Sequence, residues 1–313
     1  MSNRPIPLSS DLRRRLAALS SPRALWRHSA LHLADLVTPQ NGYHLERDLA
    51  YGALHRQRLD FYRAAKSRPG APLLVFFYGG GWHSGEKASY RFVGQALAAS
   101  GYDTAIPDYR LYPQVRFPAF MEDAAAAVGF LAQSHGHGAG RPIILMGHSA
   151  GAQIAMLLAF DRRYLGGAGV VAQEKVLAAI GLAGPYDFLP LRQERYKRVF
   201  PEESRAESQP IAFVRGGEPP VLLMAGTADR TVDPGNSKRL AARIARQGGQ
   251  AELKLYPGLG HAALLGTLLV PLRRRAPTLD DILAFIETRA KAEPIVAQEG
   301  RHLSKKLQAQ QRI

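Results

Sequence analysis

The chain contains no cysteine. This absence excludes disulfide bonds, thiolate metal sites and a cysteine nucleophile, but it does not select a redox compartment. Long apolar runs are also lacking. Near the N-terminus Leu12, Leu16 and Leu19 recur at helical spacing, and Pro22 and basic residues then interrupt the segment. We therefore expect neither a secretory signal nor a membrane span, and we predict a cytoplasmic protein.

Acidic residues are scarce beside basic ones, 26 against 41, which gives a formal net charge of +15. Residues 1–30 hold six arginines and one aspartate, and residues 291–313 hold five basic residues and two glutamates. A further basic cluster occupies positions 273–275. We interpret the charged ends as solvated arms. Weak attraction to nucleic acid or anionic membranes is the alternative, but no helix-turn-helix, zinc-finger or RNP pattern accompanies the charge, so we expect no nucleic-acid partner.

The composition, 46% hydrophobic and 21% charged, is that of a globular protein. Short β-rich runs alternate with longer helical patterns, which predicts an α/β fold: an eight-stranded, mostly parallel sheet with helices on both faces. The first two strands lie close together and are expected to form an antiparallel hairpin at one edge. Strands are predicted at 44–50, 56–62, 73–78, 102–107, 142–147, 177–183, 220–225 and 251–256. Helices are predicted at about 89–100, 118–134, 151–160, 235–247 and 278–292.

These elements predict one central domain with two flanking segments. We assign residues 1–40 to a basic N-terminal arm or helix, 41–292 to the α/β domain and 293–313 to a basic flexible tail. Within the domain, residues 184–218 are polar and irregular and contain four prolines. Such a stretch suits either a cap over the carboxyl edge of the sheet or a plain surface excursion.

The strongest chemical signal is the pentapeptide from Gly147 to Gly151, which has the form G-x-S-x-G. It follows the apolar strand residues 142–146 and precedes a helical pattern, as a nucleophile elbow requires. The flanking glycines allow close backbone approach, and the following helix places its positive end at Ser149. We predict that Ser149 is a catalytic nucleophile rather than part of a structural turn.

A serine hydroxyl needs a base, and an elbow serine is followed in the chain by an acid and then a histidine. His261 lies directly after the predicted strand 251–256, on a glycine-flanked loop, and is our candidate base. Asp229 comes first after the turn that follows strand 220–225, where its carboxylate can orient an imidazole. Asp233 is the alternative acid, although Pro234 beside it favours a helix-capping role.

A tetrahedral intermediate also needs donors for its oxyanion. Three successive glycines, residues 79–81, follow strand 73–78 directly. We predict an oxyanion hole made by the amides of Gly80, Gly81 and Ala150, with a flexible glycine turn as the alternative. This chemistry requires no metal and no organic cofactor.

Taken together, these motifs resemble those of the α/β-hydrolase superfamily, and specifically the hormone-sensitive-lipase-type carboxylesterases. Residues 78–82 are similar to that family's His-Gly-Gly-Gly-(Phe/Trp) segment, and 108–113 resemble its Asp-Tyr-Arg-Leu-Ala-Pro stretch. Residues 58–62 look like a strand of the branch near kynurenine formamidase. The resemblance covers about residues 44–290. It departs at Tyr78, which replaces the usual loop-supporting His, and at Tyr112, which replaces Ala, and no Glu follows Pro113.

The resemblance implies a two-step acyl transfer on small to medium acyl esters, with a small-molecule ester as the partner. The alternatives are an aryl formamidase or amidase of the same fold and a non-catalytic hydrolase-fold binding protein. We further expect Asp108 and Arg110 to form a buried pair that supports the glycine loop. Trp82, Tyr186 and Phe188 are expected either to line an apolar pocket or to serve as packing.

Overall fold

The computed structural model describes residue 34 and residues 36–291. The predicted tail at 293–313 and nearly all of the predicted arm at 1–40 lie outside these residues. No described helix has the length and apolar character that crossing a membrane requires.

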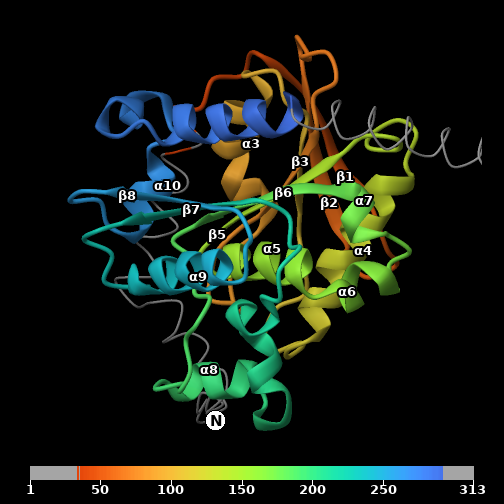
Figure 1. The fold of residues 1–313 in the computed structure, drawn as a ribbon. Coiled ribbons are helices and arrows are strands. Elements are labelled where there is room, and N and C mark those ends of the chain that lie inside the picture. The colour runs from red at the N-terminus through yellow and green to blue at the C-terminus, as the bar shows by residue number, and fades with distance from the viewer. Residues whose placement is uncertain (1–33, 35, 292–313) are drawn as a thin grey trace, which may run out of the picture.

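A single eight-stranded sheet organises the described chain, in the order β1-β2-β4-β3-β5-β6-β7-β8 (Figure 1). The β1–β2 and β2–β4 pairs are antiparallel and every other pair is parallel. The predicted fold class and the edge hairpin are therefore confirmed. The strands are β1 Tyr43–Ala50, β2 Arg58–Ala64, β3 Leu73–Phe77, β4 Thr104–Pro107, β5 Ile143–His148, β6 Val176–Leu182, β7 Val221–Gly226 and β8 Ala251–Tyr256.

Burial explains why the central strands lack alternation. Every residue of β3, β5 and β7 is buried, because helices cover both faces of a parallel sheet. The edge strands β1 and β8 are only partly buried and carry more polar residues. The sequences of the central strands are therefore continuous apolar runs.

Helices cover the two faces of the sheet (Figure 1). Helix α3 and the helix over residues 278–291 lie on one face, and α4, α5 and α9 lie on the other. All eleven residues of α5 are buried, which suits a helix that is apolar on every side. The α-helices are α3 Arg91–Ala98, α4 Ala119–Gln133, α5 Ala150–Phe160, α6 Arg162–Gly167, α7 Ala172–Lys175, α8 Glu194–Val199, α9 Gly235–Arg246 and α10 His261–Gly266, followed by the helix over 278–291.

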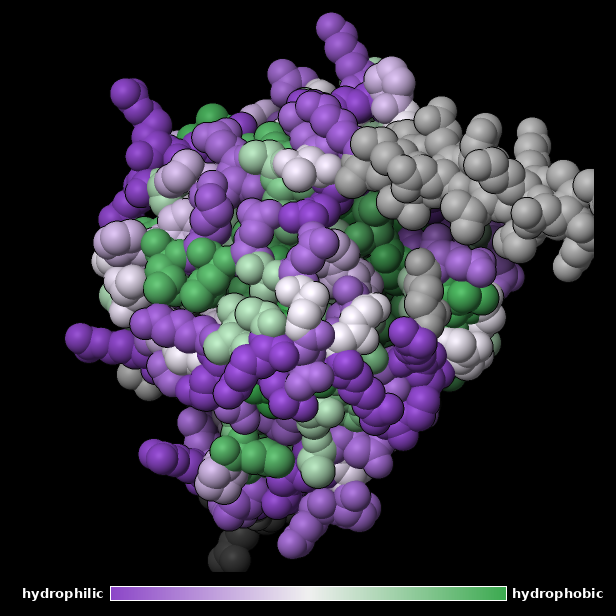
Figure 2. All heavy atoms as spheres, in the orientation of Figure 1, coloured by the Kyte–Doolittle hydropathy of each residue, from purple (hydrophilic) through white to green (hydrophobic). Residues whose placement is uncertain are grey.

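Four short 3-10 turns complete the elements of the described residues: η1 Lys87–Tyr90, η2 Glu202–Ser208, η3 Pro210–Phe213 and η4 Val270–Arg275. The segment 184–218 contains α8, η2 and η3 and lies at the bottom of the view in Figure 1. On the molecular face shown in Figure 2, hydrophilic side chains predominate and apolar ones show mainly in patches between them.

Candidate active site

Ser149 occupies a strained turn between β5 and α5. Its backbone has φ 55° and ψ −121°, a conformation that costs a non-glycine residue free energy and persists only where the surroundings impose it. A Cβ on Gly147 would lie 2.1 Å from the carbonyl oxygen of Gly151, and one on Gly151 would lie 1.9 Å from that of Phe77. The two flanking glycines are therefore required by close backbone contacts, and the turn presents the serine at the carboxyl edge of the sheet.

His261 meets this serine from a different part of the chain. It is the first residue of α10, directly after β8 and its turn. Its Nε2 lies 2.9 Å from Oγ of Ser149, and its Nδ1 lies 2.7 Å from Oδ2 of Asp229. The Asp229 side chain is almost fully buried, whereas that of His261 is 16% exposed. The structure thus brings a hydroxyl, an imidazole and a carboxylate into one hydrogen-bonded line.

Asp229 is oriented by its own loop. Its Oδ1 accepts hydrogen bonds from the amides of Thr231 and Val232, at 2.8 and 2.9 Å. Burial alone would raise the pKa of Asp229, but the hydrogen bonds from His261 and the two amides outweigh it and lower the pKa below its ordinary value. The carboxylate therefore stays ionised at neutral pH.

Asp233, the alternative acid, does something else. Its Oδ1 accepts from the amide of Gly235 at the start of α9, at 2.9 Å, and its Oδ2 lies 3.6 Å from the Arg239 guanidinium. Its carboxylate is thus engaged at a helix start, as the neighbouring proline indicated.

The glycine loop lies beside the elbow. A Cβ on Gly79 would lie 3.0 Å from Cβ of Ser149. Gly80 has φ 142°, and a Cβ there would lie 1.9 Å from the carbonyl oxygen of Ser84, so this position requires glycine. Within the described part of the chain, the amides of Gly80, Gly81 and Ala150 donate no hydrogen bond to another residue. These three amides, predicted as an oxyanion hole, therefore remain available as donors.

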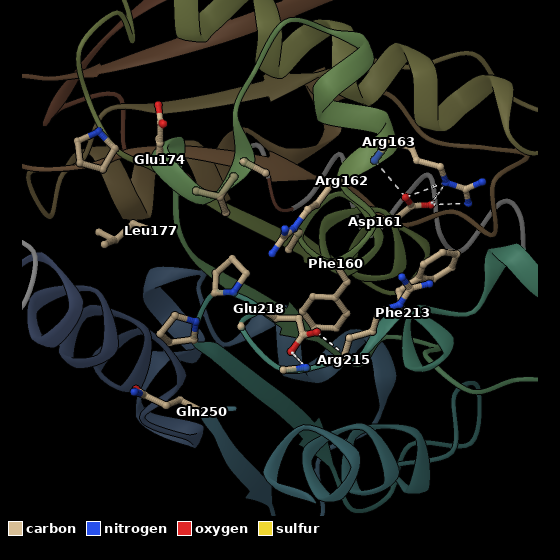
Figure 3. A pocket seen from close by; sticks show the side chains of 18 of the residues that line it. Phe160, Asp161, Arg162, Arg163, Glu174, Leu177, Phe213, Arg215, Glu218 and Gln250 are labelled. Atoms are coloured by element: carbon tan, nitrogen blue, oxygen red, sulfur yellow. Dashed lines mark hydrogen bonds and ion pairs between the residues drawn. The ribbon is translucent and has the colours of Figure 1, made fainter. Parts of the chain in front are cut away.

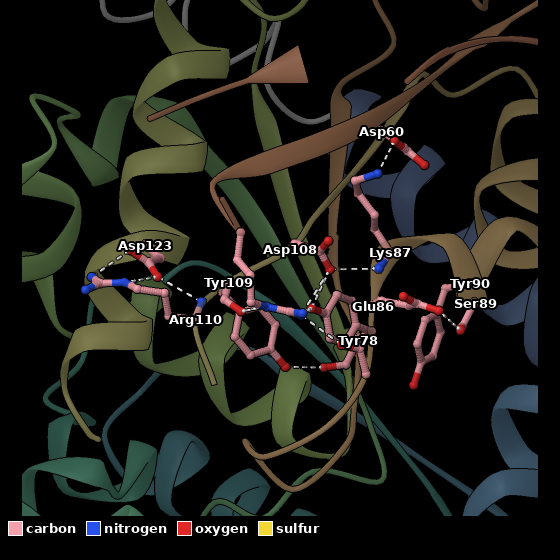
Figure 4. A network of polar contacts seen from close by, with 12 residues as sticks. Asp60, Tyr78, Glu86, Lys87, Ser89, Tyr90, Asp108, Tyr109, Arg110 and Asp123 are labelled. Carbon is pink, nitrogen blue, oxygen red and sulfur yellow. Dashed lines mark hydrogen bonds and ion pairs between the residues drawn. The ribbon is translucent and has the colours of Figure 1, made fainter. Parts of the chain in front are cut away.

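A buried polar network stands behind the glycine loop (Figure 4). The Tyr78 hydroxyl donates to Oδ1 of Asp108 at 2.6 Å and accepts from Arg56 at 2.7 Å. Arg56 also donates to the carbonyl of Gly85, and the amide of Lys87 donates to the same Asp108 oxygen. Burial raises the pKa of Asp108 above its ordinary value, although these partners offset part of the effect. The network connects both ends of the loop.

The predicted Asp108–Arg110 pair is wrong. Arg110 instead forms a two-pronged contact with Asp123 of α4, with both nitrogen–oxygen distances at 2.8 Å. Arg110 points toward α4 whereas Asp108 points toward Tyr78 (Figure 4). Sequence reasoning paired two neighbours of one motif, but the side chains of closely spaced loop residues need not point the same way.

Aromatic side chains join the loop to the segment 184–218. The ring of Trp82 stacks on Phe188 with centroids 5.9 Å apart and meets Tyr196 and Phe200 edge-on. Its indole nitrogen donates to Oε1 of Gln153, whose amide donates in turn to the carbonyl of Ser208. Trp82 is nearly buried, so it serves as packing between the loop, helix α5 and this segment.

A model of the BD-FAE family matches residues 59–244, well over half of the chain. The chain belongs to the BD-FAE family. The matched region of this BD-FAE chain includes the glycine loop, the elbow and Asp229, while His261 lies just beyond it.

Two relatives of the BD-FAE chain carry esterase names. It is 30% identical over 245 residues to a probable isoprenylcysteine alpha-carbonyl methylesterase from Arabidopsis thaliana, an alignment that covers 71% of this chain and 52% of the relative. It is 30% identical over 284 residues to esterase LipC of Mycobacterium tuberculosis, covering 81% and 67%. The chain thus spans about half the length of the first of these relatives.

Among solved structures, a hormone-sensitive lipase from a metagenome library superposes with a TM-score of 0.69 at 22% identity, covering 89% of this chain and 97% of that one. This likeness shows the α/β-hydrolase fold. Together with the relatives, it confirms the predicted resemblance to carboxylesterases of the α/β-hydrolase fold.

A cavity of about 1030 Å³ lies away from Ser149, His261 and Asp229 of the BD-FAE chain (Figure 3). It is lined by Pro142 before β5, Val176 at the start of β6 and Pro220 before β7, so it opens at the amino ends of the strands. Ser149 follows the carboxyl end of β5. The cavity therefore sits at the opposite edge of the sheet from the candidate site.

His148 is a site residue that sequence reasoning passed over. Its ring centroid lies 4.8 Å from that of His261, and its Nε2 donates to the backbone carbonyl of His261 at 3.2 Å. No sequence signal pointed to this contact, because it joins residues 113 positions apart. Gln153 did carry a signal: it is the one polar side chain in the apolar helix α5. Among the residues that the structure describes, no group of three or more metal-ligating side chains is placed to hold a metal ion.

Proposed function

We propose that this protein is a carboxylic ester hydrolase that acts on small to medium acyl esters through Ser149, His261 and Asp229. The observation that carries the proposal is the continuous line from Oγ of Ser149 through both ring nitrogens of His261 to Asp229, with distances of 2.9 and 2.7 Å. The esterase names of its relatives and its family membership support the same activity.

The proposed mechanism is a two-step acyl transfer. Oγ of Ser149 attacks the ester carbonyl while Nε2 of His261 accepts the hydroxyl proton. The carbonyl oxygen becomes an oxyanion that the amides of Gly80, Gly81 and Ala150 stabilise. His261 then gives its proton to the leaving alcohol as the carbon–oxygen bond breaks, which leaves an acyl group on Ser149.

Deacylation repeats these steps with water. His261 accepts a proton from the water as its oxygen attacks the acyl carbonyl, and the proton returns to Ser149 when the acid departs. Asp229 orients the imidazole and stabilises its charged form during both steps.

We also propose that the segment 184–218 acts as a cap on the domain 41–292. Its Phe188, Tyr196 and Phe200 surround Trp82, which directly follows the proposed oxyanion loop. A substrate held at Ser149 would therefore have aromatic side chains of this segment close by, and their packing would limit the acyl length.

Turnover of p-nitrophenyl esters from acetyl to decanoyl tests the activity, with Ser149→Ala beside the wild type. We expect turnover highest for the short and medium chains and lost in the variant, and labelling of Ser149 by a fluorophosphonate probe. N-formylkynurenine is the comparison substrate: preference for it by orders of magnitude would replace the esterase with a formamidase. Absence of both turnover and labelling would leave a non-catalytic binding protein.

A further inference from the structure

The glycine loop is held by hydroxyl groups on three consecutive carbonyls. The Tyr109 hydroxyl donates to the carbonyl of Tyr78 at 2.8 Å, and the Tyr90 hydroxyl to that of Gly79 at 3.2 Å. The Ser84 hydroxyl donates to the carbonyl of Gly80 at 2.9 Å. Ser84 lies four residues from Gly80 in the same loop, whereas Tyr90 and Tyr109 come from later segments of the chain. Only the fold therefore explains why these two tyrosines meet successive peptide groups of the loop.

A trans peptide group is planar, and its C=O and N–H point in opposite directions. The peptide bonds of this loop are trans. The group whose carbonyl belongs to Gly79 carries the amide of Gly80, and the group whose carbonyl belongs to Gly80 carries the amide of Gly81. Fixing the two carbonyls therefore fixes the direction of the two amides that we assign to the oxyanion hole.

The tyrosines that supply two of these hydroxyls are themselves fixed by stacking. The Tyr78 ring lies between Tyr109 and Tyr90, with centroids 4.8 and 5.2 Å away and interplanar angles of 19° and 17° (Figure 4). All three rings are buried. The hydroxyl of Tyr78, at the centre of the stack, is held by Asp108 and Arg56.

We propose that Tyr90 and Ser84 are positioning residues of the oxyanion hole, which aim the amides of Gly80 and Gly81 by holding the carbonyls on the far side of the same peptide planes. The stack centred on Tyr78 sets the position of Tyr90. This inference rests on the proposed ester hydrolysis and assigns the supporting residues of its electrostatic step. It also gives Tyr78 a role that a histidine's smaller ring would fill differently: the middle of a three-ring stack.

Preorganised donors stabilise the transition state more than the bound ester, so loosening them lowers kcat and leaves KM nearly unchanged. Removing a whole oxyanion donor costs about 10²- to 10³-fold in kcat. Removing the support of a donor is expected to cost less, about 10- to 30-fold for Tyr90→Phe. Ser84→Ala is expected to cost about 3- to 10-fold, because the His83 amide also donates to the Gly80 carbonyl, at 3.3 Å.

The experiment compares each variant with a matched control on the full chain. Tyr62→Phe removes a hydroxyl from another buried tyrosine, on β2, and Ser100→Ala removes a hydroxyl that donates to the carbonyl of Ala96. We expect both controls to keep kcat within about twofold of the wild type. Ser84→Thr retains a hydroxyl and should restore most of the kcat lost in Ser84→Ala.

Inhibition by a trifluoromethyl ketone supplies the second readout, because its adduct with Ser149 places an oxyanion among the loop amides. The inhibition constant should rise in Tyr90→Phe and Ser84→Ala by the same factor as kcat/KM falls. Thermal unfolding curves of Tyr90→Phe and Tyr62→Phe are compared to check that each protein is folded. A merely structural role would not raise the inhibition constant in step with the rate loss.

Three outcomes would overturn the inference: kcat within twofold of the wild type in both loop variants, a rise in KM with kcat unchanged, or a fall in kcat with the inhibition constant unchanged. Each can be told apart from failure of the proposed function. If Ser149 labels and Ser149→Ala is inactive, the hydrolase proposal stands whatever the loop variants do. If the probe does not label Ser149 and the protein does not hydrolyse esters, both proposals fail together.

Discussion

The imidazole of His148 lies against that of His261, with ring centroids 4.8 Å apart, and donates a hydrogen bond from Nε2 to the backbone carbonyl of His261. One residue thus supports both the ring and the main chain of the proposed base. His148 immediately precedes the proposed nucleophile, so this contact connects the two sides of the site directly.

We expect His148→Phe to keep the ring contact but lose the hydrogen bond, which lets the start of α10 move. A hydrogen bond is worth about 1 kcal/mol, so kcat should fall about 5- to 10-fold with little change in KM. Steady-state kinetics on the best p-nitrophenyl ester would measure it. His137→Phe, in the loop before the amino end of β5, is the matched control, and equal rates in the two variants would contradict the prediction.

Asp229→Asn should lower kcat by about 10⁴-fold, because an amide cannot stabilise the charged imidazole and selects the wrong tautomer. Asp233→Asn should leave kcat within about twofold, since that carboxylate only accepts from the amide of Gly235 and lies near Arg239. The two variants carry the same chemical change at positions four residues apart. Similar losses in both would reassign the acid.

The stability of the protein should depend on the ionisation of Asp229. Its pKa is lowered in the folded protein, so the unfolded chain binds this proton more tightly than the folded one does. The contribution of Asp229 to the free energy of unfolding is therefore present above about pH 4 and is lost as the pH falls further.

Urea unfolding of the wild type and of Asp229→Asn between pH 3 and 7 measures this contribution. The difference between the two free energies of unfolding should shrink as the pH falls below about 4, since the asparagine does not titrate. A difference that stays constant over the whole range would show that the carboxylate gains nothing from its partners.

Gln153 bridges the indole of Trp82 and the carbonyl of Ser208, and its side chain is fully buried. Gln153→Leu should leave both partners unsatisfied, at a cost of about 1–3 kcal/mol for each, and should loosen segment 184–218 from α5. We expect a lower unfolding midpoint and a preference shifted toward longer acyl chains, measured over the p-nitrophenyl series. An unchanged acyl preference would show that this segment does not select the substrate.

Much of the architecture could be predicted because it depends on local patterns. The runs in β3, β5 and β7 are apolar without alternation, as strands covered on both faces must be. The elbow is recognisable because a strand, a glycine-flanked serine and a helix follow each other directly. His261 and Asp229 could be proposed because each follows a strand, and the carboxyl ends of parallel strands meet at one edge.

The supporting contacts could not be predicted in the same way. Asp108 and Arg110 are two residues apart, yet one pairs with Tyr78 and Arg56 and the other with Asp123. Residue spacing does not indicate in which direction a loop side chain points. That direction depends on which distant element offers a matching partner.

By itself, therefore, the sequence determined the order of strands and helices along the chain, the glycines at the turns and the residue types at the ends of the strands. These follow from hydrophobic periodicity and backbone sterics, which act between near neighbours in the chain. Only the tertiary structure decided that His148 supports His261 and that three hydroxyls fix the carbonyls of residues 78–80. Apart from the contact between Ser84 and Gly80, which are four residues apart, those contacts join residues many positions apart. They form only when packing of the whole core has already fixed the backbone.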